Sequence, residues 1–243
     1  MEYKNVKRFL DIIIAISMLV GLSPLILLTA IIIKLEGKGP IIFKQERLGK
    51  DGRPFNVYKF RSMAKDNNVM DFSVQDKVTK FGKFIRKYGI DELPQFINVL
   101  KGEMSVIGPR PQLVKYMDYY TDYEKQRLLV LPGLLGPNTC TYTKKNIIDK
   151  NRLDVSYAIN LSFKEDLNIL FNMIKHFSKI LDFRENGSNG NKLNVQEELK
   201  LFEERDNLND KVNTNLLKEQ TNVDLIFEEE IAKEMKLIRD LKK

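Results

Sequence analysis

The stretch FLDIIIAISMLVGLSPLILLTAIII, residues 9–33, decides how this chain is organised. Nineteen of its 25 residues are apolar. A straight helix of that length runs about 37 Å, which exceeds a bilayer hydrocarbon core of about 30 Å. A cleaved signal peptide fits poorly, because its apolar region is shorter and a small-residue cleavage site follows it. The stretch therefore predicts a membrane segment.

Two features favour a segment that enters one leaflet and returns. Ser23 and Pro24 lie near the middle, where proline removes one backbone donor and clashes with the preceding turn. Three basic residues precede the run within 4–8 and six follow it within 34–53, whereas a crossing segment has only one strongly basic flank. We expect a re-entrant helix–break–helix, with Asp11 at the headgroup level. A single crossing with a proline kink is the alternative.

Composition and charge bound the rest of the 243-residue chain. Hydrophobic residues make up 43% and charged residues 30%, which is enough apolar material for a core and excludes global disorder. One Cys and one His exclude a disulfide-stapled fold and a zinc site, whereas magnesium needs only oxygen ligands. Residues 185–243 hold 10 Lys/Arg and 14 Asp/Glu, a net charge of −4, so the remainder of this +7 chain carries +11. A basic body predicts an anionic partner.

Past the apolar stretch the pattern changes to short elements. Apolar runs on both sides of a Gly-Lys-Asp-Gly turn at 49–52 predict a β-hairpin across 40–63. Residues 81–88 predict a basic amphipathic helix of the kind that lies at a membrane surface. Further helices are expected over 91–100, 113–131 and 152–181.

These elements predict an α+β fold in three parts. The re-entrant membrane anchor is expected over residues 1–38. A small domain of the hairpin and amphipathic interfacial helices is expected over 39–185. The Asn-Gly-rich linker at 186–191 leads into a charged helical extension, so the third part spans 186–243. Partial disorder of this extension is the alternative.

Asp91 and Glu92 are the strongest candidates for chemistry. We expect Asp91 to cap the start of a helix, where free N–H groups attract phosphate. One carboxylate can act as a nucleophile while the other holds a divalent cation. Each such feature alone is more often structural, but together with nearby cations they predict transfer of a phosphorylated group at a bilayer surface. The candidate phosphate-binding residues are Lys59, Arg61, Arg86 and Arg110.

A series of motifs in fixed order carries a family resemblance. They are KRFLD at 7–11, SP at 23–24, FKQERLG at 43–49, YKFRSM at 58–63, DELPQ at 91–95, NVLKGEMS at 98–105, GPRP at 108–111 and PG at 132–133. Over about residues 5–181 the chain closely resembles the bacterial sugar transferases. These are monotopic phosphoglycosyl transferases that start glycan assembly on polyprenol (undecaprenyl) phosphate.

The resemblance implies a role for each matching residue. Asp91 is expected to attack the β-phosphorus of a UDP-sugar and release UMP, forming a covalent phospho-sugar that polyprenol phosphate then accepts. Glu92 is expected to help hold Mg²⁺, the expected cofactor. Basic positions near the phosphates match Lys59, Arg86 and Arg110, and the break of the re-entrant anchor matches Ser23 and Pro24.

The resemblance also implies a location and partners. The domain over 39–185 is expected to be catalytic, at the cytoplasmic face of a bacterial inner membrane. The product starts a capsule, exopolysaccharide, O-antigen or glycoprotein glycan. Expected partners are the UDP-sugar, polyprenol phosphate and membrane lipid, with other enzymes of glycan assembly or a second copy of the chain as further candidates, and no nucleic acid.

Residues 134–143 depart from the family pattern and motivate an alternative. The family carries a Gly-Leu-Ala-Gln-Val-Asn-Gly-Arg-like stretch there, whereas this chain reads Leu-Leu-Gly-Pro-Asn-Thr-Cys-Thr-Tyr-Thr. A catalytically impaired member that binds polyprenol phosphate or a partner as an adaptor is therefore the second hypothesis. A membrane-tethered nucleic-acid binder is the third, but no nucleic-acid fold motif accompanies the basic charge.

Overall fold

The computed structural model describes residues 3–63, 78–138, 146–181 and 196–207. The chain forms two compact units, Met1–Leu199 and Lys200–Lys243. Only residues 200–207 of the second unit are described, and they are helical. The helical extension is thus confirmed within 196–207, while the linker at 186–191 lies outside the described residues.

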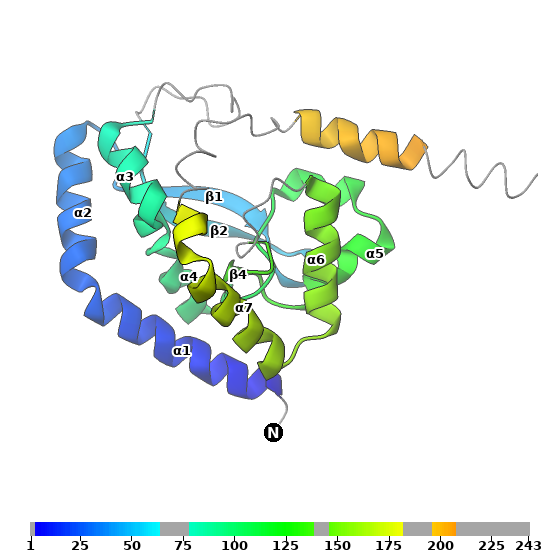
Figure 1. Ribbon diagram of the computed structural model, residues 1–243. Coiled ribbons are helices and arrows are strands. Elements are labelled where there is room, and N and C mark those ends of the chain that lie inside the picture. The colour runs from blue at the N-terminus through cyan, green and yellow to red at the C-terminus, as the bar shows by residue number, and fades with distance from the viewer. Residues whose placement is uncertain (1–2, 64–77, 139–145, 182–195, 208–243) are drawn as a thin grey trace, which may run out of the picture. The chain divides into compact units, whose positions relative to one another are not determined.

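The apolar stretch forms two helices with a bend between them. Helix α1 spans Tyr3–Gly21 and α2 spans Ser23–Glu36, at 61° to one another (Figure 1). Pro24 lies in the first turn of α2, where its missing N–H costs least, so the predicted break is confirmed. In the described part of the chain no single helix has the length and apolar character to cross a bilayer, although this bent pair does when taken together. Re-entry into a membrane stays a prediction.

The predicted hairpin is confirmed. Strand β1 (Ile42–Leu48) pairs antiparallel with β2 (Pro54–Phe60). Between them the chain turns through the 3₁₀ segment Lys50–Gly52. Asp51 and Gly52 take left-handed φ angles of 56° and 74°, a conformation that Asp tolerates and Gly adopts freely. This turn fixes the register in which Phe43 faces Lys59.

A second small sheet was not predicted from the sequence. Strand β3 (Ser105–Ile107) lies parallel to β4 (Gly133–Leu135). Glycine is required where the two segments approach each other, because a Cβ on Gly133 would stand 2.1 Å from the backbone nitrogen of Gly108. The Pro-Gly and Gly-Pro motifs therefore serve a close backbone approach as well as two turns.

Helix α3 (Lys80–Tyr88) forms where the sequence predicts it. Thr79 caps its start by accepting a hydrogen bond from the Gly82 N–H at 2.9 Å. Gly89 ends it in the left-handed conformation, with φ at 73°. Both ends thus follow from residue type.

The helix expected over 91–100 begins differently, and the prediction that Asp91 is its N-cap is wrong. A 3₁₀ turn spans Ile90–Glu92, and α4 follows over Gln95–Lys101. Gly89 is both the end of α3 and the start of this turn, whose last N–H donates to the Gly89 carbonyl at 3.1 Å. The helical conformation therefore begins before Asp91.

The single helix expected over 113–131 is also wrong. Thr121 is extended and starts a new helix, since its side chain and that of Glu124 form a reciprocal capping box. The segment consists of η4 (Val114–Tyr119), α5 (Asp122–Lys125) and η5 (Gln126–Leu129). The helices expected within 152–181 are confirmed, with α6 (Ile147–Ile159) starting earlier than expected and α7 (Phe163–Lys175) following it.

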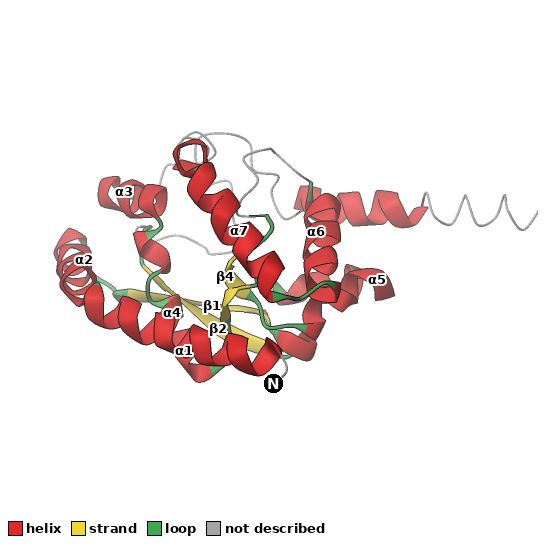
Figure 2. Ribbon diagram, turned by 60° about the horizontal axis from the view of Figure 1, so that its bottom comes forward, coloured by secondary structure: helices red, strands yellow, loops and turns green. Residues whose placement is uncertain are grey.

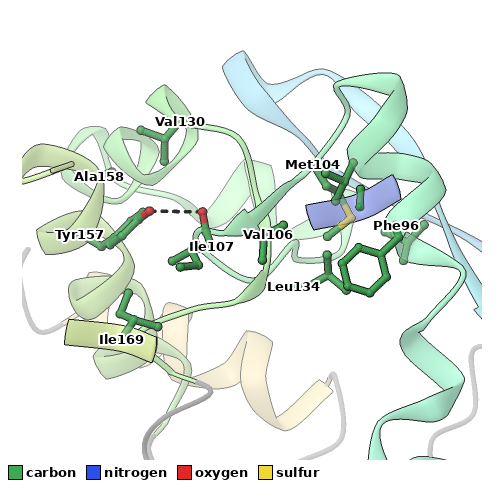
Figure 3. Packing of buried hydrophobic residues seen from close by; sticks show 12 residues of the cluster. Phe96, Met104, Val106, Ile107, Val130, Leu134, Tyr157, Ala158 and Ile169 are labelled. Carbon is green, nitrogen blue, oxygen red and sulfur yellow. Dashed lines mark hydrogen bonds between the residues drawn. The ribbon is translucent and has the colours of Figure 1, made fainter. Parts of the chain in front are cut away.

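The strands lie in the middle of the first unit with helices around them (Figure 2). Val99 and Met104 are fully buried in one hydrophobic cluster, and inside it the Tyr157 hydroxyl donates to the Ile107 carbonyl at 3.2 Å (Figure 3). Asp11 is only 4% exposed and accepts a hydrogen bond from the Val106 N–H at 2.9 Å. The carboxylate thus satisfies a strand donor inside the protein, while its expected place at the headgroup level stays a prediction.

Candidate functional site

Glu92 is the centre of a charged cluster. Its Oε1 accepts a hydrogen bond from Lys59 Nζ at 2.8 Å and another from Arg110 Nη2 at 2.6 Å. Lys59 comes from β2 and Arg110 from the turn after β3, so three separate segments meet at one oxygen. Although burial raises the pKa of Glu92, the attraction of Arg110 and Lys59 outweighs it and holds the pKa well below its usual range. Glu92 is therefore ionised.

Asp91 lies beside Glu92, and its pKa is shifted in the opposite direction. It is 8% exposed, and burial followed by repulsion from Glu92 raises its pKa. The charges of Lys59, Arg86 and Arg110 act in the opposite direction. Among the described residues no group donates a hydrogen bond to its carboxylate. Its oxygens are thus surrounded by positive charge yet available to a ligand.

Arg86 completes the basic surroundings of Asp91. It lies in the last turn of α3, and its Nε donates to Ser62 Oγ at 2.7 Å. Burial lowers the pKa of Arg86, and the charge of Asp91 opposes that change. The structure therefore brings together five of the predicted site residues, namely Asp91, Glu92, Lys59, Arg86 and Arg110.

Arg61 takes a different place from the one expected. Its Nη2 donates to the carbonyls of Ile33 and Gly37, at 2.8 Å each, and so caps the end of α2. Strand β2 ends at Phe60, so Arg61 lies just beyond it. Binding of phosphate by Arg61 stays a prediction that the geometry does not favour.

A buried ion pair that no sequence motif predicts holds the backbone of Arg110. Arg127 and Asp154 are 2% and 1% exposed and pair with each other. Arg127 also donates to the Arg110 carbonyl at 2.8 Å and to the Tyr120 hydroxyl at 3.0 Å. No local motif marks these residues, since they lie 27 positions apart. Residues 139–145 of the divergent loop lie outside the described residues, but Asn138 before them donates to Asp154 at 2.8 Å.

The carboxylate pair suits a magnesium ion. No group of three or more His, Cys, Asp or Glu side chains in the described ranges could form an all-protein metal site. Mg²⁺ is nevertheless usually held by one or two carboxylates, with substrate phosphates and water filling its octahedron. Asp91 and the second oxygen of Glu92 supply that kind of donor set. Two acidic groups side by side, one with a raised pKa, are also what an added cation would stabilise.

Fold and site together define an α+β protein whose acidic pair, set among three cations, suits phosphate chemistry. The chain belongs to the bacterial sugar transferase family, whose model matches residues 2–179. This finding confirms the resemblance drawn from the ordered motifs.

Three curated relatives illustrate the match. The uncharacterized sugar transferase EpsL of Bacillus subtilis is 43% identical over 169 residues, which is 68% of this chain and 83% of that protein. A UDP-N-acetylgalactosamine-undecaprenyl-phosphate N-acetylgalactosaminephosphotransferase of Aeromonas hydrophila is 41% identical over 71% of this chain and 44% of its own length. A UDP-glucose:undecaprenyl-phosphate glucose-1-phosphate transferase of Klebsiella pneumoniae is 40% identical over 68% and 38%. The chain thus spans less than half of the last two.

Proposed function

We propose that this protein is a phosphoglycosyl transferase that moves a sugar 1-phosphate from a UDP-sugar to undecaprenyl phosphate and so starts a glycan. The observation that carries the proposal is the Asp91–Glu92 pair among Lys59, Arg86 and Arg110. Family membership and the reactions printed in the names of the relatives support the same substrate classes.

In the first step an Asp91 carboxylate oxygen attacks the β-phosphorus of the donor. The bond between that phosphorus and the bridging oxygen breaks, and UMP leaves with the electron pair. The surrounding cations favour this step in two ways. They stabilise the ionised form of Asp91, and they neutralise the donor phosphates that would otherwise repel it.

In the second step the acceptor phosphate oxygen attacks the same phosphorus. The Asp91–phosphorus bond breaks, which regenerates the carboxylate and yields undecaprenyl diphospho-sugar. Glu92 would hold Mg²⁺ through its free oxygen while Lys59 and Arg110 keep its side chain in place. When bound, the cation supplies positive charge beside the phosphate oxygens.

We place this reaction at the cytoplasmic face of a bacterial inner membrane, with α1 and α2 as a re-entrant anchor. Exposed apolar side chains support that placement. Phe9 and Val20 on α1 are 64% and 69% exposed, and Leu27 and Leu35 on α2 are 64% and 81% exposed. Burying such a surface in lipid is favourable, at about 25 cal/mol for each square ångström.

The test is UMP release with a panel of UDP-sugars, Mg²⁺ and a short-chain polyprenol phosphate. Donor alone should leave a phospho-sugar adduct on the protein, seen by intact-mass analysis. Asp91→Asn should abolish both signals, whereas Asp118→Asn, at an exposed position outside the cluster, should change neither. No UMP with any donor from folded protein would reject the proposal in favour of an adaptor role.

A further inference from the structure

Arg47 is a basic residue on the site face of the hairpin that the mechanism above does not use. In the register of β1 and β2, Phe43 is opposite Lys59 and Arg47 is opposite Phe55. Residues that pair directly, and residues two apart along a strand, share a face. Arg47 therefore lies on the same face as Lys59, whose ammonium binds Glu92.

The charge of Arg47 has no carboxylate partner among the described residues. Its guanidinium donates to Gln45 Oε1 on the same strand, a neutral acceptor. Three other cations near the site have carboxylate partners, since Lys59 and Arg110 pair with Glu92 and Arg127 pairs with Asp154. A half-buried guanidinium without an anion is costly, so an anionic ligand would be stabilised there.

The turn that carries Arg110 lies against this part of the hairpin. The Leu48 N–H, next to Arg47, donates to the Gln112 carbonyl at 2.8 Å. Arg47 is consequently close enough to Arg110 and Glu92 for both charges to shift its pKa. Burial and then repulsion from Arg110 lower the pKa of Arg47 to about 10, while Glu92 acts in the opposite direction.

An anion of the protein already lies near Arg47. The Tyr116 hydroxyl donates to Glu198 Oε2, and both groups act on the charge of Arg47. Glu198 belongs to the acidic extension, which lies outside the family match at 2–179. A carboxylate from outside the family match is thus close enough to act on the charge of Arg47.

We propose that Arg47 and Tyr116 form a second phosphate subsite, beside the Glu92–Arg110 pair, that binds the nucleotide phosphate of the donor. The inference rests on the proposed function and assigns Arg47 to the binding of its leaving group, UMP. When the bond to the β-phosphorus breaks, negative charge develops on the phosphate of UMP. An unpaired guanidinium next to Arg110 would stabilise that charge without losing an existing ion pair.

The register favours the nucleotide over the lipid phosphate as occupant. Arg61 fastens the Phe43–Lys59 end of the hairpin to the C-terminal end of α2. Arg47 lies four residues farther along β1, about 13 Å away at the usual strand rise. The subsite is therefore at the end of the hairpin away from the contact with that anchor helix, which favours a water-soluble ligand over a lipid.

Calorimetric titration of the full chain with UMP, in detergent with Mg²⁺, tests the assignment without turnover. Losing a charge-assisted contact should weaken UMP binding about tenfold or more in Arg47→Ala. Arg47→Lys should lose less. Arg53→Ala is the matched control, because it removes an equal charge from an exposed position of the same hairpin and should leave UMP affinity unchanged. Glu198→Gln should tighten UMP binding by removing a competing anion.

Binding of uridine and of a short-chain prenyl phosphate shows which phosphate Arg47 contacts, that of the nucleotide or that of the lipid. Uridine affinity should be equal in wild type and Arg47→Ala. Equal UMP affinities in Arg47→Ala and Arg53→Ala would overturn the proposal, and so would a loss confined to prenyl phosphate. Thermal unfolding shows whether each variant is folded. If Arg47→Ala does not fold, Arg47→Lys, which keeps the charge but loses the guanidinium, takes its place in the comparison with Arg53→Ala. UMP release by the wild type, measured in parallel, decides the proposed function separately.

Discussion

Two adjacent carboxylates in this protein have pKa values that their surroundings shift in opposite directions. Lys59 and Arg110 both bind one oxygen of Glu92 and keep its pKa low, whereas burial and Glu92 itself raise the pKa of Asp91. Pairs of titratable groups whose environments push their pKa values apart mark divided roles in a site. The geometry fits Glu92 as the fixed ligand and Asp91 as the group that reacts.

A double-mutant cycle at Glu92 tests this division. Lys59→Met and Arg110→Met should each lower the rate of UMP release about a hundredfold, because each removes a preorganised charge. The double variant should lose much less than the product of the two, since both side chains hold the same oxygen. Lys44→Met is the control, an exposed lysine on the opposite face of the hairpin that lies over the Tyr58 ring. Strict additivity would show that the cations act independently.

The Arg127–Asp154 pair should contribute mainly to the stability of the fold. Arg127→Met leaves a carboxylate buried without its partner, which should lower the free energy of unfolding by about 3–5 kcal/mol. Arg152→Met breaks an exposed pair with Asp149 and should cost about 0–1 kcal/mol. Denaturant unfolding in detergent compares the two, and equal losses would contradict a buried, essential pair.

Residue types and spacing predicted most of the charged cluster, but not its support. The acidic pair and three of its cations could be named from motifs because their chemistry is visible in the residue types. The motif around Arg61 did not indicate that this side chain would donate to the carbonyls of Ile33 and Gly37 at the end of α2. Arg127 and Asp154 escaped prediction because burial of a charge depends on tertiary packing, which the local pattern does not show.

At the scale of elements, prediction succeeded where one residue dictates the backbone. Proline at position 24 placed the helix break, and the Gly-containing turn at 49–52 placed the hairpin. Prediction failed at Thr121, where a helix N-cap interrupts a stretch whose apolar spacing suggested one continuous helix. The strands β3 and β4 are three residues each, too short for alternation to be recognised.

Replacing Ser23 and Pro24 by Ala tests the bend between α1 and α2. Restored helix geometry should straighten the anchor toward a full crossing. A cysteine at residue 2, in a Cys140→Ser background, should then become reachable by an impermeant thiol reagent from outside the cell. In the unaltered anchor it should not. Labelling that stays cytoplasmic in the double Ala variant would argue that packing on the body, not the break, sets the topology.

The close approach between Gly133 of β4 and Gly108 after β3 should not tolerate a methyl group. Gly133→Ala places a Cβ 2.1 Å from the Gly108 nitrogen, so the backbone must shift. The expected loss is about 1–3 kcal/mol or more of unfolding free energy. Gly37→Ala is the control, because its Cβ would meet only Arg61, at 4.0 Å. Comparable melting temperatures for the two variants would rule out the close approach.

At the scale of the whole molecule, the family domain and the extension separate in sequence and in charge. The family match ends at residue 179, and the net charge changes sign near residue 185. Every residue of the Asp91–Glu92 cluster comes from within the match. The predicted division at 1–38, 39–185 and 186–243 stays a prediction, since contacts group Met1–Leu199 in one unit.

Deleting residues 187–243 should therefore leave the chemical step intact. The rate at saturating donor should change by roughly twofold or less, a barrier difference below about 0.5 kcal/mol. The KM for the donor should fall, because Glu198 no longer lies near Arg47. Initial rates of UMP release across donor concentrations give both constants, and Glu198→Gln should reproduce the fall in KM alone. A folded truncation that releases no UMP would mean that the extension supplies part of the site.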